Sequence, residues 1–465
     1  MKTINFKKHK FAVIGLGDTG LSIIDYLRYC QADVIKIFDT RDNPPHQDAV
    51  SKYQLFCGKL DINQFNDVDV IAISPGVSIY EPVLQELITQ GKIIVGDIEL
   101  FALATKDWPS KIIGITGSNG KTTVTTLVGY LAEASGYTAL VAGNIGTPVL
   151  QSYIQIMQTG NIPQVIVLEL SSFQLETTYS LNLIAATVLN ISEDHLDRYR
   201  DLLEYAYAKS HIFNNCKTQI LNISDPLVVS MSRSKSKHIW FGDDPVATYK
   251  IAKVSSPIGI GDLSKDNNTL YLNIDKKNYI KCSSLQLVGI HNYLNVLASL
   301  ALLSAAGINI HDPKLKDALH AFKGLEHRMQ KVGESGGITY IEDSKGTNVG
   351  AVVAGISGLD KPVNLILGGD GKGQDFSPLR KLVENYCKSV AILGQDKQKI
   401  NEVLVGLAVP IKLCDSLEEC VLFCNSNAAS GEYVVLSPAC ASWDMFDNYK
   451  HRAQVFIDCV KKVMK

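Results

Sequence analysis

The feature that most constrains the fold of this chain is a repeated pairing of a short apolar run with a polar or glycine-rich cluster. Apolar β-type runs alternate with helical patterns through most of the 465 residues, which is typical of parallel sheets covered by helices. Each cluster lies just past the end of an apolar run, where the carboxyl ends of parallel strands form ligand sites. Core packing would not place polar residues there so consistently. The clusters are centred on Gly15, Lys121, Glu169, His195, Asp343, Lys372 and Ser437.

The runs predict three α/β domains, with boundaries near residues 99 and 324. Residues 1–99 open with FAVIGLGDTG, where we expect a strand over 11–14 and a helix from about Thr19. Residues 100–324 contain KIIGITGSNGKTT and QVIVLELSSF, and residues 325–465 contain PVNLILGGDGKG and EYVVLSPACAS. Residues 225–288 differ, because KHIWFGDD, ATYKIAKV, NTLYLNID and NYIKCSSLQL have the pattern of short alternating strands. They predict a small antiparallel sheet on the central domain.

Composition excludes several classes of function. Hydrophobic residues make up 46% and charged residues 20% of the chain, as in ordinary globular proteins. A net charge of −2 gives no field that would attract nucleic acid or an anionic membrane. The apolar run LASLALLSAAG is too short to span a bilayer, and no secretory segment follows the basic N-terminus. The ten cysteines include no C-x-x-C pair. We therefore expect a cytoplasmic monomer without disulfides or structural zinc.

The stretch IIGITGSNGKTT, residues 112–123, resembles a phosphate-binding loop with unusual spacing. The strict pattern requires a glycine five positions before Gly120, where Ile115 stands. Backbone N–H groups of such a turn and of the following helix bind anions, while Lys121 can reach the outer phosphates and the Thr122 hydroxyl can bind Mg²⁺. A tight strand-to-helix turn is the alternative. The combination of Gly117 and Gly120 with Lys121 and Thr122 favours a phosphate site.

Two acidic segments follow the next strands. Glu169 stands near the carboxyl end of QVIVLELSSF, where nucleotide sites hold a Mg²⁺ carboxylate. NISEDHLDRY places His195 past the following strand, with Glu193, Asp194 and Asp197 around it. Acidic residues beside a histidine suit metal binding or general-base catalysis. A structural glutamate and a solvated surface loop remain the alternatives.

The loop GLGDTG, residues 15–20, fits the G-x-G-x-x-G pattern of dinucleotide-binding folds, with Asp39 at a suitable distance. This observation supports a rival hypothesis, an NAD-dependent oxidoreductase. Nothing near TRDNPP, which begins at Thr40, resembles a hydride-transfer site. A glycine loop followed by Thr40 and Arg41 suits a nucleotide diphosphate equally well.

The sequence GITGSNGKTT resembles the G-x-T-G-x-N-G-K-T loop of the Mur ligase family, and the unusual spacing is that family's own. HNYLNVLAS, GLEHRM and the three-domain layout agree with this resemblance. Mur ligases are ATP-dependent amide ligases of cytoplasmic peptidoglycan-precursor synthesis, related to folylpolyglutamate synthetase. The resemblance implies an N-terminal Rossmann-like UDP-binding domain, a central P-loop-type ATP-binding domain and a C-terminal Rossmann-like domain that binds the acceptor amino acid.

Five further motifs, ELSSFQLE, EDHLDRY, DSKGTNVGA, GGDGKGQDF and LSPACASWDMF, resemble the branch that adds D-glutamate to UDP-N-acetylmuramoyl-L-alanine. The branch that adds diaminopimelate or lysine would show a D-N-P-R motif, which this sequence lacks. Other Mur ligases and folylpolyglutamate synthetases would lack the DTR and DSKGTN signatures. Ile290, Gly346 and Trp443 depart from the family pattern. The resemblance implies an acyl-phosphate reaction that serves cell wall biogenesis, cell shape and cell division.

The resemblance also implies a site where ATP, two Mg²⁺ ions and both substrates meet. The residues that it assigns to ATP are Gly117, Ser118, Asn119, Gly120, Lys121, Thr122, Thr123, Asn292, Asn295, Arg328 and Asp343. Those for the UDP substrate are Asp18, Thr19, Thr40, Arg41, Ser74, Gly76, Asn144 and Ser171. Those for D-glutamate are His195, Lys345, Thr347, Lys372, Ser442 and Tyr449. The metal ligands are Thr122, Glu169, His195 and Lys209, and the catalytic set is Lys121, Glu169, His195 and Lys209.

Lys209 carries two opposed interpretations. In LLEYAYAKSHIF it shares a helical face with Tyr205 and Phe213, and by itself this pattern predicts a lysine that extends to solvent. The resemblance places its amine beside the second Mg²⁺, where an ammonium would repel the ion. It therefore implies a carbamate on Lys209. A non-catalytic nucleotide-binding regulator could keep the phosphate loop but would not need Glu169, His195 and Lys209 together.

Overall fold

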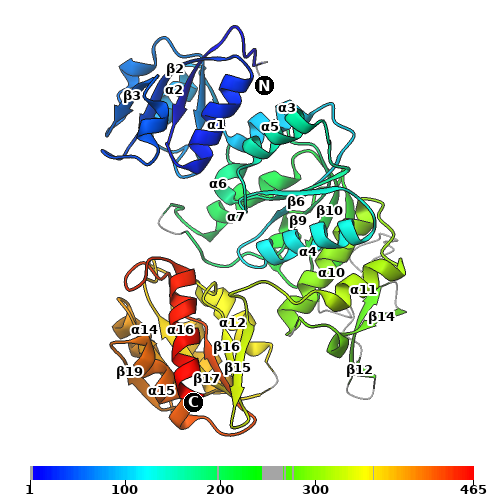
Figure 1. The fold of residues 1–465 in the computed structure, drawn as a ribbon, viewed down its shortest axis with the longest axis vertical. Helices are drawn as coiled ribbons and strands as arrows, with labels where there is room; N and C mark the ends of the chain where they lie inside the picture. Colours follow the sequence, from blue (N-terminus) through cyan, green and yellow to red (C-terminus); the bar gives the residue numbers. More distant parts are fainter. Residues whose placement is uncertain are drawn as a thin grey trace.

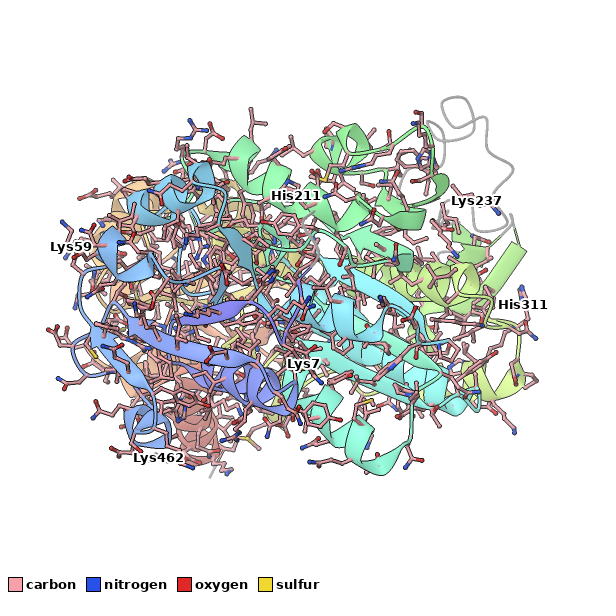
Figure 2. The ribbon with its side chains drawn as sticks, turned by 90° about the horizontal axis from the view of Figure 1, so that it is seen from above. Lys7, Lys59, His211, Lys237, His311 and Lys462 are labelled. Atoms are coloured by element: carbon pink, nitrogen blue, oxygen red, sulfur yellow. The ribbon has the colours of Figure 1, made fainter. Side chains whose placement is uncertain are left out.

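The computed structural model describes residues 4–195, 198–242, 265–266, 269–274, 277–287, 289–359 and 361–464. Three α/β units follow one another along the longest axis of the molecule, with the central unit between the other two (Figure 1). Asp197 and the strand predicted over residues 247–254 lie outside the described residues. Exposed charged side chains such as Lys59, Lys237 and Lys462 project from the rim of the molecule (Figure 2).

The N-terminal unit is a parallel sheet with strand order β3-β2-β1-β4-β5. The predicted strand and helix are both present, and the glycine loop joins them. A Cβ atom on Gly20 would lie 1.8 Å from the carbonyl oxygen of Gly15, so glycine permits the helix to pack this closely on the loop. The elements are β1 (Lys10–Ile14), α1 (Asp18–Tyr29), β2 (Asp33–Asp39), β3 (Gln54–Cys57), β4 (Val70–Ile73), α2 (Pro82–Thr89) and β5 (Ile93–Val95).

The central unit contains a parallel sheet with strand order β11-β10-β9-β6-β8-β7. Its strands begin with β6 (Lys111–Thr116), β7 (Ala139–Gly143), β8 (Val165–Glu169) and β9 (Leu183–Val188), and end with β10 (Cys216–Asn222) and β11 (Lys237–Phe241). Its helices are α3 (Asp97–Thr105), α4 (Lys121–Ala134), α5 (Val149–Thr159), α6 (Ser172–Leu175), α7 (Leu202–Ser210), α8 (Pro226–Ser230), α10 (Ile290–Ala305) and α11 (Pro313–Ala321). Helices α4 and α10 pack on one face of the sheet, and α5 packs against α1 of the N-terminal unit.

The prediction that KHIWFGDD belongs to an antiparallel sheet is wrong. Residues 237–241 form β11, which pairs in parallel with β10 at the edge of the central sheet. An edge strand with an exposed beginning and a buried end, here Lys237 and Phe241, has the same short mixed pattern as an antiparallel strand. The small antiparallel sheet itself is present, and consists of β12 (Lys265–Asp266), β13 (Thr269–Ile274) and β14 (Lys277–Lys281).

The C-terminal unit is a mixed sheet with strand order β15-β16-β20-β17-β18-β19. β15 runs antiparallel to β16, because the turn between them contains Gly336 and Gly337, with φ of 59° and 78°. The strands are β15 (Gln330–Ser335), β16 (Ile338–Glu342), β17 (Val363–Gly368), β18 (Cys387–Leu393), β19 (Ile411–Leu413) and β20 (Tyr433–Leu436). The helices are α12 (Val349–Ser357), α13 (Pro378–Tyr386), α14 (Lys397–Leu404), α15 (Leu417–Asn427) and α16 (Tyr449–Val463).

The first predicted domain boundary, at residue 99, falls inside α3, and the second, at residue 324, falls between α11 and β15. No helix in the described ranges is long and apolar enough to cross a membrane. Every cysteine lies within the described residues, and each is a free thiol.

A buried carboxylate joins α3 to the beginning of α6. Asp97 is 3% exposed, and its Oδ2 accepts a hydrogen bond of 3.0 Å from Gln174 Nε2. Gln174 in turn accepts hydrogen bonds from the backbone N–H and the hydroxyl of Ser171. Burial raises the pKa of Asp97 to about 6, because water no longer solvates the charged form.

We predict that Asp97 makes the stability of the fold fall as pH rises. The unfolded carboxyl has an ordinary pKa of about 4, so between about pH 4 and pH 6 the folded state binds the proton more tightly. Asp97→Asn should remove this dependence. The unfolding free energy of the variant relative to the wild type should rise by up to about 3 kcal/mol across that interval. Urea unfolding from pH 4.5 to 7.5 measures it.

Asp107→Asn is the matched control, because the Asp107 side chain is 88% exposed. Its unfolding free energy should run parallel to that of the wild type. Parallel curves for Asp97→Asn as well would contradict the prediction.

Candidate active site

The phosphate loop joins β6 to α4 and is shaped by two glycines. Gly117 and Gly120 have φ of 146° and 84°, in the region that favours glycine. A Cβ atom on Gly120 would lie 2.6 Å from Asn295 Oδ1 on α10. Lys121 is the first residue of α4, and its Nζ donates to the carbonyl oxygens of Gly117, at 2.7 Å, and Ser118, at 2.8 Å. The lysine charge is therefore held over the loop at a helix N-terminus, which suits phosphate binding.

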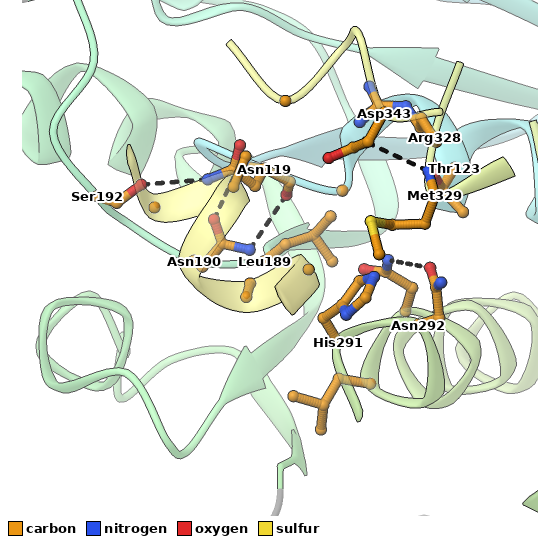
Figure 3. A pocket seen from close by; sticks show the side chains of 18 of the residues that line it. Asn119, Thr123, Leu189, Asn190, Ser192, His291, Asn292, Arg328, Met329 and Asp343 are labelled. Atoms are coloured by element: carbon orange, nitrogen blue, oxygen red, sulfur yellow. Dashed lines mark hydrogen bonds between the residues drawn. The ribbon is translucent and has the colours of Figure 1, made fainter. Parts of the chain in front are cut away.

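A second segment, directly after β9, fixes the backbone of this loop. Asn190 Oδ1 accepts from the N–H of Asn119 at 2.9 Å, and Asn190 Nδ2 donates to the Asn119 carbonyl at 3.1 Å. The Ser118 hydroxyl accepts from the N–H of Ser192 and donates to the Ser192 carbonyl. Figure 3 shows Asn190 and Ser192 beside Asn119. Sequence reasoning missed Asn190 and Ser192, although their position just past a strand end was the signal that could have found them.

Glu169 supplies a buried carboxylate at the adjacent strand end. It is the last residue of β8 and is 3% exposed. Its Oε1 accepts from Asn144 Nδ2 at 3.2 Å, whereas its Oε2 is buried and has no hydrogen-bond partner within the described residues. Burying an unpaired carboxylate oxygen is costly unless a cation binds it. Because Mg²⁺ prefers hard oxygen ligands, Glu169 fits a magnesium site.

Lys209 is buried beside these groups, and its side chain does not extend to solvent. It is 1% exposed, its Nζ lies 4.5 Å from the centre of the Tyr205 ring, and Thr116 Oγ1 lies 3.5 Å away. Burial, and after it the charge of Lys121, lowers the pKa of Lys209 well below its ordinary value. The pKa of Lys121 is also lowered by burial, while the charge of Glu169 opposes that change. The three side chains therefore share one electrostatic environment.

His195 lies at the edge of this group. Its backbone has φ of 56°, and its ring packs 4.9 Å from the ring of Phe173 and 6.4 Å from that of Tyr205. The Nε2 atom is 3.8 Å from Asp194 Oδ2. Within the described residues no three His, Cys, Asp or Glu side chains form a metal cluster. A magnesium site here would depend on Glu169 with hydroxyl, phosphate or modified-lysine oxygens.

A cavity of about 270 Å³ opens between the central and C-terminal units. It is lined by the four further residues predicted to contact ATP, Asn292, Asn295, Arg328 and Asp343, together with Asn119 and Gly120 of the loop and Thr123 of α4. Figure 3 shows Asn119, Thr123, Asn292, Arg328 and Asp343 around the cavity. His291 also lines the cavity and was not predicted. Burial lowers its pKa to about 4, and its buried Nδ1 has no partner within the described residues. The cavity therefore presents a neutral imidazole and several amides, which suit a nucleoside.

The C-terminal unit contacts the phosphate loop directly. Arg328 Nη2 donates to Thr122 Oγ1 at 3.3 Å. The side-chain amides of Asn119 and Asn348 bond to each other in both directions, at 3.3 Å and 3.2 Å. Asn348 also caps α12, because its Oδ1 accepts from the N–H of Ala351 at 2.8 Å. Sequence reasoning missed this role of Asn348 because it required knowledge of how the domains pack.

Asp343 closes the far wall of the cavity. It is 6% exposed, and burial raises its pKa to about 7. Its carboxylate accepts from the Ser437 hydroxyl at 2.7 Å and from the Met329 N–H at 3.2 Å. A Cβ atom on Gly346 would lie 2.5 Å from Asp343 Oδ2, so the glycine that departs from the family pattern leaves room for this carboxylate.

Five of the residues predicted for D-glutamate lie in the C-terminal unit, four on loops and Tyr449 at the start of α16, whereas His195 lies in the central unit. Lys345 Nζ is 3.4 Å from the Tyr449 hydroxyl and 4.6 Å from the centre of its ring, so the structure brings these two together. Thr347 lies two residues further on, and its N–H donates to the Lys345 carbonyl. Lys372 is exposed, with φ of 50°. In the same loop, Asp370 forms an antiparallel β-bridge with Ala441. Ala441 directly precedes Ser442, which is buried.

The residues predicted for the UDP substrate follow β1, β2 and β4. Asp39 is 1% exposed and accepts from the Leu16 N–H at 2.7 Å and from the Arg41 guanidinium at 2.7 and 2.8 Å. Burial opposes its ionisation, but these hydrogen bonds outweigh burial and lower its pKa to about 2. The carboxylate therefore positions Arg41 at the rim. Asp18 and Thr19 begin α1, Thr40 follows β2, Ser74 and Gly76 follow β4, Asn144 follows β7, and Ser171 caps α6.

The chain is similar to known proteins along nearly its whole length. Three family models match it: the Mur ligase MurD-like N-terminal domain over residues 9–96, the Mur ligase middle domain over 115–303, and the Mur ligase glutamate ligase domain over 327–440. The UDP-N-acetylmuramoylalanine--D-glutamate ligase of Nitrosomonas eutropha is 45% identical, with 99% of this chain and 97% of that protein covered. The protein of the same name from Chromobacterium violaceum is 43% identical, with 99% of each covered.

Solved structures show the same fold at low sequence identity. The MurF ligase of Thermotoga maritima in complex with ADP has a TM-score of 0.60 and 14% identity, with 99% of this chain and 98% of that chain covered. The UDP-N-acetylmuramate-alanine ligase MurC of the same organism has a TM-score of 0.56 and 16% identity, with 98% and 100% covered. With domain matches from residue 9 to residue 440 and full-length relatives above 40% identity, the chain belongs to the Mur ligase family.

Proposed function

We propose that this Mur ligase joins D-glutamate to UDP-N-acetylmuramoyl-L-alanine, with ATP as the second substrate. The observation that carries the proposal is the 45% identity, across 99% of the chain, to a relative named for this reaction. The L-alanyl carboxylate attacks the γ-phosphoryl group of ATP and releases ADP. The amine of D-glutamate then attacks the resulting acyl phosphate. The tetrahedral intermediate expels phosphate and leaves the amide, so the enzyme is an ADP-forming acid–amino-acid ligase of peptidoglycan synthesis.

The geometry of the central unit supports the ATP half of this reaction. Lys121 and the N-terminus of α4 hold the phosphates, and Arg328 approaches them from the C-terminal unit. Glu169, with its unpartnered Oε2, would hold Mg²⁺, and Thr122, His195 and a modified Lys209 would complete the sites of two ions. When bound, Mg²⁺ neutralises charge on the phosphate oxygens. The cavity lined by Asn292, Asn295 and Asp343 would take the nucleoside.

The two remaining regions would receive the other substrates. The UDP moiety would lie on the loops after β1, β2 and β4, where Asp39 positions Arg41. D-glutamate would lie among Lys345, Thr347, Lys372, Ser442 and Tyr449, because cations must neutralise its two carboxylates. We further propose that the enzyme acts as a cytoplasmic monomer in cell wall biogenesis, on which cell shape and division depend. Its free thiols suit a reducing compartment.

The test of this function is ADP release by the purified protein with ATP, Mg²⁺ and UDP-N-acetylmuramoyl-L-alanine. We expect release with D-glutamate and none with L-alanine, L-lysine, meso-diaminopimelate or L-glutamate. Replacing UDP-N-acetylmuramoyl-L-alanine with a folate should give no reaction, and NAD should have no effect. Release with a different amino acid would assign the chain to another branch, and NAD reduction without ADP release would support the oxidoreductase alternative.

We predict that Lys372→Ala raises the KM for D-glutamate far more than the KM for ATP. A charge-assisted hydrogen bond contributes about 1.5–3 kcal/mol, so the KM for D-glutamate should rise roughly 10- to 100-fold. Steady-state kinetics with each substrate varied in turn measure both constants. Lys381→Ala, on the exposed side of α13, is the control and should change neither. A larger rise in the KM for ATP would reassign Lys372 to the nucleotide.

We predict that Lys209 is carbamylated in the active enzyme. Its amine is fully buried and near the unpartnered Glu169 oxygen, where an ammonium would repel a metal ion. The neutral Nζ attacks CO₂, an N–C bond forms, and one proton leaves to solvent. The product is a carbamate anion whose two oxygens suit Mg²⁺. The modification thus replaces a cation with a carboxylate-like ligand.

Carbon NMR of the enzyme equilibrated with ¹³C-bicarbonate tests this modification. We expect a carbamate signal that Lys209→Ala abolishes, together with most turnover. Lys106→Ala, at an exposed lysine, should retain both signal and turnover. Absence of the signal in fully active wild-type enzyme, or full turnover of Lys209→Ala, would refute the carbamate.

A further inference from the structure

The structure assigns a positioning role to Arg198, which nothing in the phosphate or substrate sites explains. We propose that Arg198 fixes the loop carrying His195 against the UDP-binding loop, residues 74–77, and so sets the distance between the bound UDP substrate and the phosphate site. This proposal rests on the proposed function, because it concerns the alignment of the two substrates of that reaction.

The guanidinium of Arg198 crosses from the central unit to the N-terminal unit. Its Nη1 donates to the Pro75 carbonyl at 2.8 Å, and its Nη2 donates to the Val77 carbonyl at 3.2 Å. Both acceptors lie directly beside Ser74 and Gly76, the residues predicted to contact UDP. The backbone of the UDP-binding loop is therefore attached to a side chain of the central unit.

A buried ion pair holds the same guanidinium from the other side. Arg198 Nη2 lies 2.9 Å from Glu176 Oε2, and the two side chains are 11% and 3% exposed. The other carboxylate oxygen of Glu176 accepts from the Tyr199 hydroxyl at 2.6 Å. Arg198 and Tyr199, which follow one another in the chain, thus each bind one oxygen of the Glu176 carboxylate at the end of α6. A buried ion pair in which both carboxylate oxygens are bonded restricts its partners to one arrangement.

The contacts continue to His195 itself. The guanidinium of Arg198 stacks 3.8 Å from the centre of the Phe173 ring, and Phe173 packs 4.9 Å from the His195 ring. The N–H groups of Arg198 and Tyr199 both donate to the His195 carbonyl, at 3.0 and 3.1 Å. The Arg198 and Tyr199 N–H groups therefore fix the backbone of His195. Phe173, which stacks on Arg198, fixes the ring of His195.

Only arginine can make this set of contacts. Its planar fork reaches two carbonyls and a carboxylate while its flat face stacks on an aromatic ring. Lysine keeps the charge that Glu176 requires, but its single ammonium cannot span all three acceptors. Arg198→Lys therefore keeps a positive charge beside Glu176, which the fold requires, but loses the attachment to the UDP-binding loop. Arg198→Ala would instead leave Glu176 buried and uncompensated, and the variant could fail to fold.

The test is steady-state kinetics of Arg198→Lys in the complete ligation assay. We expect the KM for UDP-N-acetylmuramoyl-L-alanine to rise roughly tenfold, because a displaced loop loses a contact of hydrogen-bond strength. We expect kcat to fall by about 10²-fold, as misplacement of reacting groups by about 1 Å can cause. The KM for ATP should stay within about twofold, because the contacts of Arg198 with other described residues do not include the phosphate loop or the cavity lining.

Arg200→Lys is the matched control, because Arg200 lies two residues further on, pairs with Glu204 and has a side chain that is 86% exposed. It should leave all three constants unchanged. Glu176→Gln is the second variant; it keeps the shape of the ion pair and should shift the same constants in the same direction by a smaller factor. If Arg198→Lys lowers the thermal midpoint but leaves the kinetic constants unchanged, Arg198 is only structural and the proposal is wrong. A wild-type enzyme inactive with D-glutamate would instead refute the proposed function.

Discussion

The constraint on which the rest of the site depends is the burial of two lysines beside one carboxylate at the strand ends of the central sheet. Burial lowers the pKa of both lysines, and the charge of Lys121 lowers the pKa of Lys209 further. Glu169 keeps one oxygen without a hydrogen-bond partner within the described chain. Burying these lysines and an unpaired carboxylate oxygen is costly when no ligand is bound. It becomes favourable when polyphosphate and a divalent ion enter, because each charge then has a partner. Parallel topology creates this group of charges by bringing the carboxyl ends of β6, β8 and β9 to one edge of the sheet.

Much of the fold was predictable because it follows from periodicity. Buried parallel strands such as β4 and β8 are continuous apolar runs, and a glycine loop or polar cluster marks the end of each. β11 was assigned to the wrong sheet because an edge strand has no distinctive pattern. The phosphate-loop pattern indicated Lys121, and the family resemblance supplied four further residues predicted to contact ATP, which line the cavity. Asn348 and Arg198 could not be predicted, since their partners are 229 and 121–123 residues away along the chain.

The two joints between the units differ in physical character. The joint between the N-terminal and central units combines two hydrogen bonds from the Arg198 guanidinium to carbonyl oxygens with an apolar cluster, in which α1 packs on α5 and Tyr26 lies 5.6 Å from Tyr153. The ion pair of Arg198 with Glu176 lies within the central unit and holds the guanidinium in place. Among the described residues, the joint between the central and C-terminal units includes a neutral amide pair, one arginine–hydroxyl hydrogen bond and contacts between α10 and α12, and it borders a cavity. The first joint is mainly apolar and is tied by one charged side chain, whereas the second is mainly polar and borders a cavity.

This difference decides which joint can open during a reaction cycle. Opening the first joint would break two hydrogen bonds from a charged guanidinium, each contributing about 1.5–3 kcal/mol, and would expose the apolar cluster to water. Separating two amides beside a cavity exchanges their hydrogen bonds for bonds to water, at a net cost of about 1 kcal/mol each. Substrates that must enter between domains therefore meet least resistance at the second joint. In the proposed function, UDP would bind beside the first joint, so the donor carboxylate would be held in place while ATP and the acceptor amino acid exchange around it.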